Sequence, residues 1–408
     1  MSNSRPWPTA LTGLLLLAAA MGIGRFAFTP LLPMMLHDGV LDLPGASLLA
    51  TLNYLGYWLG AVGCALQPWL WQRLRVQRPV VPTRAVRAGL LATVLLTAGM
   101  AQPWAAGWPL WRFLAGVASA LVFVYGSGWC MAQLTAQGRS ALGGVMFVGP
   151  GLGIAVSGLA ASAMVALGWA AAEGWAVFAL LAALLTALAW PQLRAVAPGP
   201  ALAPQARSGG QGAAMVAFVL AYGLAGFGYI VTATFLPVIA RQALPGSLWL
   251  DLFWPLFGLA VAAGALLTLR LPPQWDRRHL LVGCYAMQAL GVFSTVWLPT
   301  VSGFVLGSLL LGLPFTAITL FVVQEARRLR PHSASAAIGL LTAAYGLGQI
   351  AGPPLVAVLL QHSSSPGQGF ALSLQVAAWA LLGGMALFAM LARRHPLPGD
   401  TPGPALQR

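Results

Sequence analysis

The chain has 408 residues, of which 59% are hydrophobic and only 7% are charged. This composition excludes an ordinary soluble domain, in which about 25% of residues are charged. The cations behind the formal net charge of +14 are all arginines, and most of them lie in short segments between apolar runs. That pattern is typical of the cytoplasmic loops of a membrane protein and argues against a partner nucleic acid.

Twelve apolar runs, each long enough to cross a bilayer, follow one another along the chain. We therefore predict an all-α integral membrane protein with twelve transmembrane helices in two pseudo-symmetric six-helix halves. The expected spans lie near residues 9–36, 47–71, 86–104, 107–135, 140–168, 174–193, 213–240, 249–270, 280–298, 303–324, 336–361 and 369–392. The N-terminal half covers residues 1–193 and the C-terminal half residues 213–393. Residues 194–212, rich in Pro, Ala, Gly and Gln, are expected to form a flexible cytoplasmic linker, and residues 394–408 a cytoplasmic tail.

The arginines predict the orientation of these spans. With the N-terminus inside, every arginine outside the spans except Arg241 falls on the cytoplasmic side, as the positive-inside rule requires. Both termini are then cytoplasmic, and we expect a multi-pass protein of the bacterial inner membrane. The first apolar run is too long for a cleaved signal peptide and is interpreted as a retained span. The three cysteines are dispersed within apolar runs and predict neither a disulfide framework nor a metal site: Cys64, Cys130 and Cys284.

One stretch of the first span recurs in the seventh. Gly22-Ile-Gly-Arg-Phe-Ala-Phe-Thr-Pro-Leu-Leu-Pro33 is followed 204 residues later by Gly226-Phe-Gly-Tyr-Ile-Val-Thr-Ala-Thr-Phe-Leu-Pro237, with the two glycines and the final Leu-Pro matched. Tyr229 stands where Arg25 stood. The spacing indicates a duplicated membrane protein whose halves each begin with a specialised helix.

Arg25 is the first candidate site residue. It lies about 22 Å from the start of its apolar run, too deep for the guanidinium to reach the nearer surface easily. A charge at that depth must face protein, water or a ligand, and such residues commonly bind ions or substrates. Thr29, four residues on, would share its helical face. The alternative is a structural arginine held by carbonyls that Pro30 and Pro33 leave free.

Arg112 is the second charged candidate. It lies about 6 Å into the fourth span, so it could either bind a ligand or snorkel to the headgroups. Gly116 and Ser119 continue its face as a small-residue groove.

The remaining candidates are polar or aromatic residues at helical spacing. They could line a cavity or tie helices together, and the sequence leaves both open. These are Asn53 and Tyr57 in the second span, Tyr222 and Tyr229 in the seventh, and Tyr345 and Gln349 in the eleventh.

The predicted span interiors contain no Asp, Glu or His. Two arginines without a carboxylate make the interior electropositive, which favours anions, because arginine binds carboxylates and phosphates through two parallel hydrogen bonds. The chain has no metalloprotease, serine-hydrolase or phosphate-loop motif, so we expect no enzyme, no catalytic residues, no cofactor and no metal.

Three strings carry a family resemblance. Gly22–Pro33, Arg112-Phe-Leu-Ala-Gly-Val-Ala-Ser-Ala120 and Tyr345-Gly-Leu-Gly-Gln-Ile-Ala-Gly-Pro353 resemble the YbfB-like, uncharacterised branch of the major facilitator superfamily. The resemblance covers essentially all twelve spans. It implies alternating access between two halves around a site near the membrane midplane. It also implies that the first helix of each three-helix unit lines the cavity, which brings together Arg25, Arg112 and Tyr229 with Thr316 and Thr319.

We therefore predict a secondary active transporter for a small organic anion, working as a monomer in a lipid bilayer. A proton or a counter-ion would accompany the substrate. The alternatives are a multidrug-type efflux carrier and a membrane sensor or assembly factor that does not transport.

Overall fold

A computed structural model describes residues 6–76, 80–194, 212–247, 249–272, 275–330 and 334–394, and this part of the chain forms helices without a strand. The helices before residue 195 are α1 (Pro6–Leu17), η1 (Ala18–Arg25), α2 (Phe28–His37), α3 (Leu43–Arg73), α4 (Pro82–Gly99), η2 (Ala105–Gly107), α5 (Trp108–Leu121), η3 (Val122–Gly126), α6 (Ser127–Ala136), η4 (Ser140–Phe147), α7 (Val148–Ala166), α8 (Ala171–Ala189) and η5 (Trp190–Gln192). Those after residue 211 are α9 (Gly212–Ala243), α10 (Phe253–Thr268), α11 (Arg277–Trp297), α12 (Val301–Gly312), α13 (Phe315–Leu329), α14 (Ala334–Gln361) and α15 (Pro366–Arg394). The all-α prediction is confirmed.

Ten helical stretches of the described chain are long and apolar enough to cross a membrane. Two further helices occupy positions where spans were predicted. One is α4, whose mean hydropathy is lowered by Arg84 and Arg87, and the other is α10, which is apolar but only 16 residues long. The protein is a multi-pass membrane protein on this count.

The first candidate span, Pro6–His37, is not a single regular helix. Its middle, η1, is a π-helix, and two turn residues separate it from α2. The proline nitrogens of Pro30 and Pro33 carry no hydrogen and cannot continue the helix ladder. At Gly22 an added Cβ would lie 2.5 Å from the Cα of Gly153, so α7 can approach η1 this closely only because both residues are glycines.

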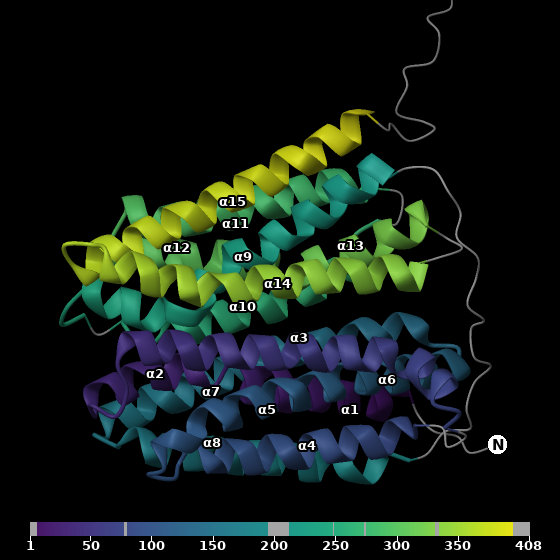
Figure 1. The fold of residues 1–408 in the computed structure, drawn as a ribbon, viewed down its shortest axis with the longest axis horizontal. Helices are drawn as coiled ribbons and strands as arrows, with labels where there is room; N and C mark the ends of the chain where they lie inside the picture. The colour runs from purple at the N-terminus through teal and green to yellow at the C-terminus, as the bar shows by residue number, and fades with distance from the viewer. Residues whose placement is uncertain are drawn as a thin grey trace, which may run out of the picture.

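Helices near in sequence gather together. Figure 1 shows α1 to α8 in the lower part of the view and α9 to α15 in the upper part. Helices α3 and α14, α7 and α10, and α2 and α9 contact one another across the boundary between these groups.

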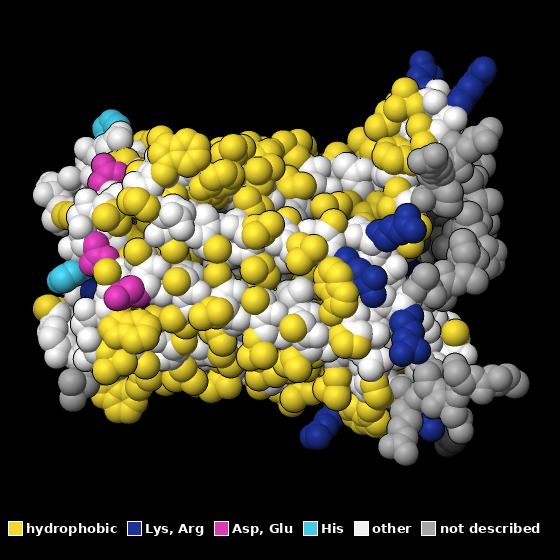
Figure 2. Space-filling view, turned by 90° about the horizontal axis from the view of Figure 1, so that it is seen from below, with side chains coloured by type: hydrophobic (Ala, Val, Ile, Leu, Met, Phe, Trp, Pro, Cys, Tyr) yellow, Lys and Arg dark blue, Asp and Glu magenta, His cyan; other side chains and the backbone are white. Residues whose placement is uncertain are grey.

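Opposite charges gather at opposite ends of the molecule. Figure 2 shows arginine side chains at one end and acidic and histidine side chains at the other. We call these the basic end and the acidic end. Arg241 at the acidic end pairs with Asp251.

A buried ion cluster lies at the basic end, where Asp276 accepts the amide of Arg278 and caps α11. The guanidinium of Arg278 bonds Asp276 at 2.7 Å and lies 3.9 Å from Glu325, which also accepts from Arg328 at 2.8 Å. Helix α13 continues to Leu329, past the predicted boundary at 324. Glu325 therefore lies inside the candidate span Val301–Leu329, and Glu173 lies near the start of Ala171–Gln192, so the prediction of spans without carboxylates is wrong at these two positions.

Candidate functional site

Arg25, at the end of η1, is 3% exposed. Its Nη2 donates to Oε1 of Gln349 at 2.6 Å, and its Cζ lies 4.0 Å from the centre of the Tyr57 ring. Within the described part of the chain, no carboxylate forms an ion pair with Arg25, and its Nε has no hydrogen-bond partner. The guanidinium is therefore a buried cation held by a neutral amide and aromatic faces, with a donor to spare.

Gln349 of α14 connects Arg25 to a set of aromatic rings. Its Nε2 donates to the hydroxyl of Tyr229 on α9. The Tyr229 ring stacks on that of Tyr345 at 5.7 Å, and Tyr345 stacks on Tyr222 at 4.5 Å. Since arginine can only donate, the amide oxygen must face Arg25 and the amide nitrogen must face Tyr229.

Arg112 of α5 has a different environment. It is 2% exposed, and its Nη1 and Nη2 donate to the carbonyls of Gly24 and Arg25 at 3.5 and 3.3 Å. The amide of Thr29 bonds the Phe26 carbonyl instead of that of Arg25, four residues back, so the break leaves a carbonyl for Arg112. Arg112 thus satisfies the backbone that positions Arg25 and does not snorkel to a surface.

The other predicted residues form separate contacts, and only one of them bonds an arginine. Asn53 donates to the Arg112 carbonyl at 2.9 Å and so ties α3 to α5. Thr29 donates to the Ala233 carbonyl at 2.9 Å, across the boundary between the two helix groups, and not toward the Arg25 guanidinium. Thr319 accepts from the hydroxyl of Tyr222 at 3.1 Å. Arg25, Tyr57, Tyr229, Tyr345 and Gln349 are the candidates that the structure brings together.

Several residues around this cluster were not predicted. The hydroxyls of Tyr54 and Thr234 lie 2.8 Å apart across the boundary, and the Trp58 indole donates to the Ala343 carbonyl at 2.9 Å. Phe315 packs edge-on against Tyr229 at 4.9 Å. Tyr54 lies one residue after Asn53, and only a contact from another helix could have singled it out.

The cluster is closed toward the acidic end. There Thr29, Tyr54 and Thr234 are at most 3% exposed and contact one another's helices. Tyr57 and Tyr345, which lie nearer the basic end on α3 and α14, are only partly buried. The neighbours of Arg25 on the basic side are therefore less buried than those on the acidic side.

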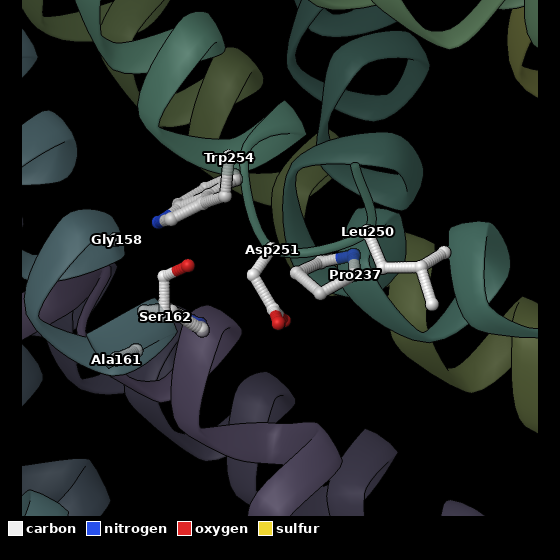
Figure 3. Close-up of a pocket in the computed structure, with 8 residues that line it drawn as sticks. Gly158, Ala161, Ser162, Pro237, Leu250, Asp251 and Trp254 are labelled. Atoms are coloured by element: carbon white, nitrogen blue, oxygen red, sulfur yellow. The ribbon is translucent and has the colours of Figure 1, made fainter. Parts of the chain in front are cut away.

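A separate pocket opens at the acidic end, among α2, α7, α9 and α10. Figure 3 shows the indole of Trp254 and the hydroxyl of Ser162 facing each other, with the carboxylate of Asp251 beside Pro237. The space that it offers to the centre of a water-sized molecule is only about 10 Å³, about enough for one water. We therefore do not assign a small-molecule site here. The described residues hold no group of three His, Cys, Asp or Glu side chains that could bind a metal.

The matching family and the similar solved structures are all of transporters. The model of the family described as "Uncharacterised MFS-type transporter YbfB" matches residues 17–390. A mutant of the nucleoside transporter NupG superposes with a TM-score of 0.68 at 14% identity, covering 94% of this chain and 99% of that one. A bacterial homolog of the human lysosomal transporter Spinster, solved inward-facing and unoccupied, gives 0.67 at 14% identity, covering 96% and 98%. No functionally curated protein sequence matches the chain.

Proposed function

Because the chain belongs to the family described as "Uncharacterised MFS-type transporter YbfB", we propose that it is a secondary transporter. It would move a small organic anion by alternating access. The observation that carries the anion assignment is the burial of Arg25 without a carboxylate partner. An uncompensated buried charge is costly, and an anionic substrate would compensate it at the moment of binding.

Alternating access requires two halves that rock about a central site, and the contacts support this arrangement. Thr29 bonds Ala233, its own counterpart 204 residues later, as expected for residues beside a pseudo-two-fold axis. The contacts of α7 with α10 and of α14 with α3 also correspond to each other when the two halves are exchanged. We propose twelve spans in two six-helix halves, residues 1–193 and 213–393. The proposed linker, residues 194–212, falls outside the described residues except at Arg194 and Gly212.

The charge distribution supports an orientation. We propose that the basic end is cytoplasmic, as the positive-inside rule favours, with both termini in the cytoplasm of a bacterial cell. Closure toward the acidic end then corresponds to a state with the site facing inward.

Transport by this site would not need a proton-carrying side chain beside Arg25. Charge would be compensated by anion exchange or by a proton carried on the substrate. Asp38 and Glu173, at the acidic end, accept hydrogen bonds from the backbone amides of Ala171 and Ala170 and so cap the start of α8. If neutralising either residue abolished proton-driven uptake while exchange survived, a side-chain proton carrier would exist.

Uptake by proteoliposomes tests the proposed function. Purified protein reconstituted into vesicles preloaded with a mixture of organic anions should accumulate labelled carboxylates, and protein-free vesicles should not. Exchange of neutral solutes at the same rate as anions would contradict the anion assignment. No flux of any carboxylate or neutral solute would contradict the transporter itself.

A further inference from the structure

The substrate class of the central site can be narrowed from the position of one side chain. The Gln349 carboxamide lies between a cation and a phenol, with its oxygen on Arg25 at 2.6 Å and its nitrogen on Tyr229. Arg25, Tyr229 and Gln349 are all at most 3% exposed. We propose, building on the anion transport proposed above, that the site binds a carboxylate attached to a planar aromatic ring, and that this carboxylate replaces the Gln349 carboxamide.

A carboxylate has the planar shape of a carboxamide but carries two acceptors and a full negative charge. One oxygen accepts from Nη2 of Arg25, as Oε1 of Gln349 does now. The other accepts from the hydroxyl of Tyr229, which rotates from acceptor to donor. Nε of Arg25, buried and without a partner, remains available to complete a bidentate pair. Exchanging the neutral amide for an anion neutralises Arg25, which gives the substrate an advantage over Gln349.

The shape of the contact favours a carboxylate over a phosphate or a sulfate. Gln349 fills the space between Arg25 and Tyr229 with two polar atoms in one plane. A tetrahedral anion carries further oxygens outside that plane, where the ring face of Tyr57 covers Arg25 and the ring of Tyr345 stacks on Tyr229.

Aromatic rings continue from this contact on α3, α9 and α14. Tyr345 is stacked between Tyr229 and Tyr222, with centroid distances of 5.7 and 4.5 Å. Tyr57 covers Arg25 on the α3 side, and both Tyr57 and Tyr345 are partly exposed. Because both faces of the Tyr345 ring are covered, a ring attached to a carboxylate on Arg25 would meet its partly exposed edge. An aromatic ring gains edge-to-face contacts there that a saturated ring lacks.

Three probes of similar size separate charge from planarity: benzoate, cyclohexanecarboxylate and benzamide. Binding to the purified full-length protein is measured by thermal shift and calorimetry. We expect benzoate to bind about fivefold more tightly than cyclohexanecarboxylate, and benzamide to bind more weakly than either anion.

Equal affinities for benzoate and cyclohexanecarboxylate would overturn the aromatic class and leave the proposed anion transport intact. Benzamide binding as tightly as benzoate would overturn both the aromatic carboxylate class and the proposed preference for anions. If none of the three binds at the highest soluble concentration while labelled anions still enter proteoliposomes, the aromatic carboxylate class is also excluded and only the transport proposal survives.

Variants of Gln349 test the replacement itself. Gln349→Ala removes the competing amide and should tighten benzoate binding about fivefold, whereas loss of benzoate binding in a folded variant would mean that Gln349 is itself a required ligand. Gln349→Glu places a carboxylate on Arg25 permanently and should abolish benzoate binding without lowering the melting temperature. The matched control is Gln288→Ala, which removes a buried glutamine that bonds Leu311 in the same half and should leave benzoate binding unchanged.

A second pair of variants tests the ring. Tyr345→Leu removes the middle of the stack and should abolish the preference for benzoate over cyclohexanecarboxylate. Trp297→Leu removes a ring stacked on Phe293, within α11 and outside the Arg25 network, and should preserve the preference. An unchanged preference in Tyr345→Leu would show that the stack does not hold the ring.

Discussion

The close approach of α3 and α5 can be tested with one methyl group at Gly56. A Cβ added at this residue would lie 2.0 Å from the carbonyl oxygen of Phe113, where ordinary contacts begin at 3.4 Å. The obstacle is backbone, so no side chain can rotate away, and the two helices must separate by more than 1 Å. Such a separation also strains the hydrogen bond from Asn53 to the Arg112 carbonyl.

We expect Gly56→Ala to lower the free energy of unfolding by about 3 kcal/mol, the upper part of the usual range for overpacking. Gly63→Ala in the same helix is the matched control, because an added Cβ there meets nothing within 4 Å. Alanine's higher helix propensity should stabilise that variant by up to about 1 kcal/mol. The two substitutions are chemically identical and should differ by about 3–4 kcal/mol.

The measurement is equilibrium unfolding in mixed micelles with increasing sodium dodecyl sulfate, followed by tryptophan fluorescence. Folded yield and melting temperature provide a second readout. Equal stabilities of the two variants would refute the helix contact and the positioning of Arg112 that depends on it.

Three further predictions follow from other contacts. Arg112→Met should lower the free energy of unfolding by about 2–5 kcal/mol, because the carbonyls of Gly24 and Arg25 lose their donors. The folded fraction should keep its preference for carboxylates over neutral analogues. Loss of that preference would mean that Arg112 is itself a ligand. Burial raises the pKa of Asp276, but hydrogen bonds and the charge of Arg278 outweigh it and hold the pKa below the ordinary 3.8. The ion pair therefore contributes stability that is present above pH 3.8 and is lost as the pH falls below it. Acidification should accordingly lower the free energy of unfolding more in wild type than in Asp276→Asn, and an equal loss in the two proteins would contradict this. A periplasm-active reporter fused after Arg207 should be silent and one fused near Gln361 active, and the reverse pattern would invert the orientation.

The helices were predictable because apolar runs of about twenty residues have few alternatives in a chain with so little charge. Their ends were less predictable, since polar residues extend a helix beyond its apolar core. Helix α13 continues through Glu325 to Leu329, and the ion cluster with Arg278 explains why a carboxylate can be buried there.

The candidate site was partly readable because the depth of Arg25 and the spacing of Tyr345 and Gln349 are local properties. The position of Thr29 was not readable in the same way. Four-residue spacing places two side chains on one face only in a regular α-helix, and the π-helix and turn after Arg25 break that register. The partners of Arg112 depend on carbonyls released in another helix, which no pattern within its own span could indicate.

The central claim is that the Arg25 guanidinium binds the substrate carboxylate. The most direct test is the dissociation constant of benzoate in folded Arg25→Lys and Arg25→Gln, measured beside wild type. Lysine keeps the charge but loses the planar fork and should weaken binding by about 1–3 kcal/mol, while glutamine should abolish it. Unchanged affinity in both variants would contradict the claim and remove Arg25 from the site.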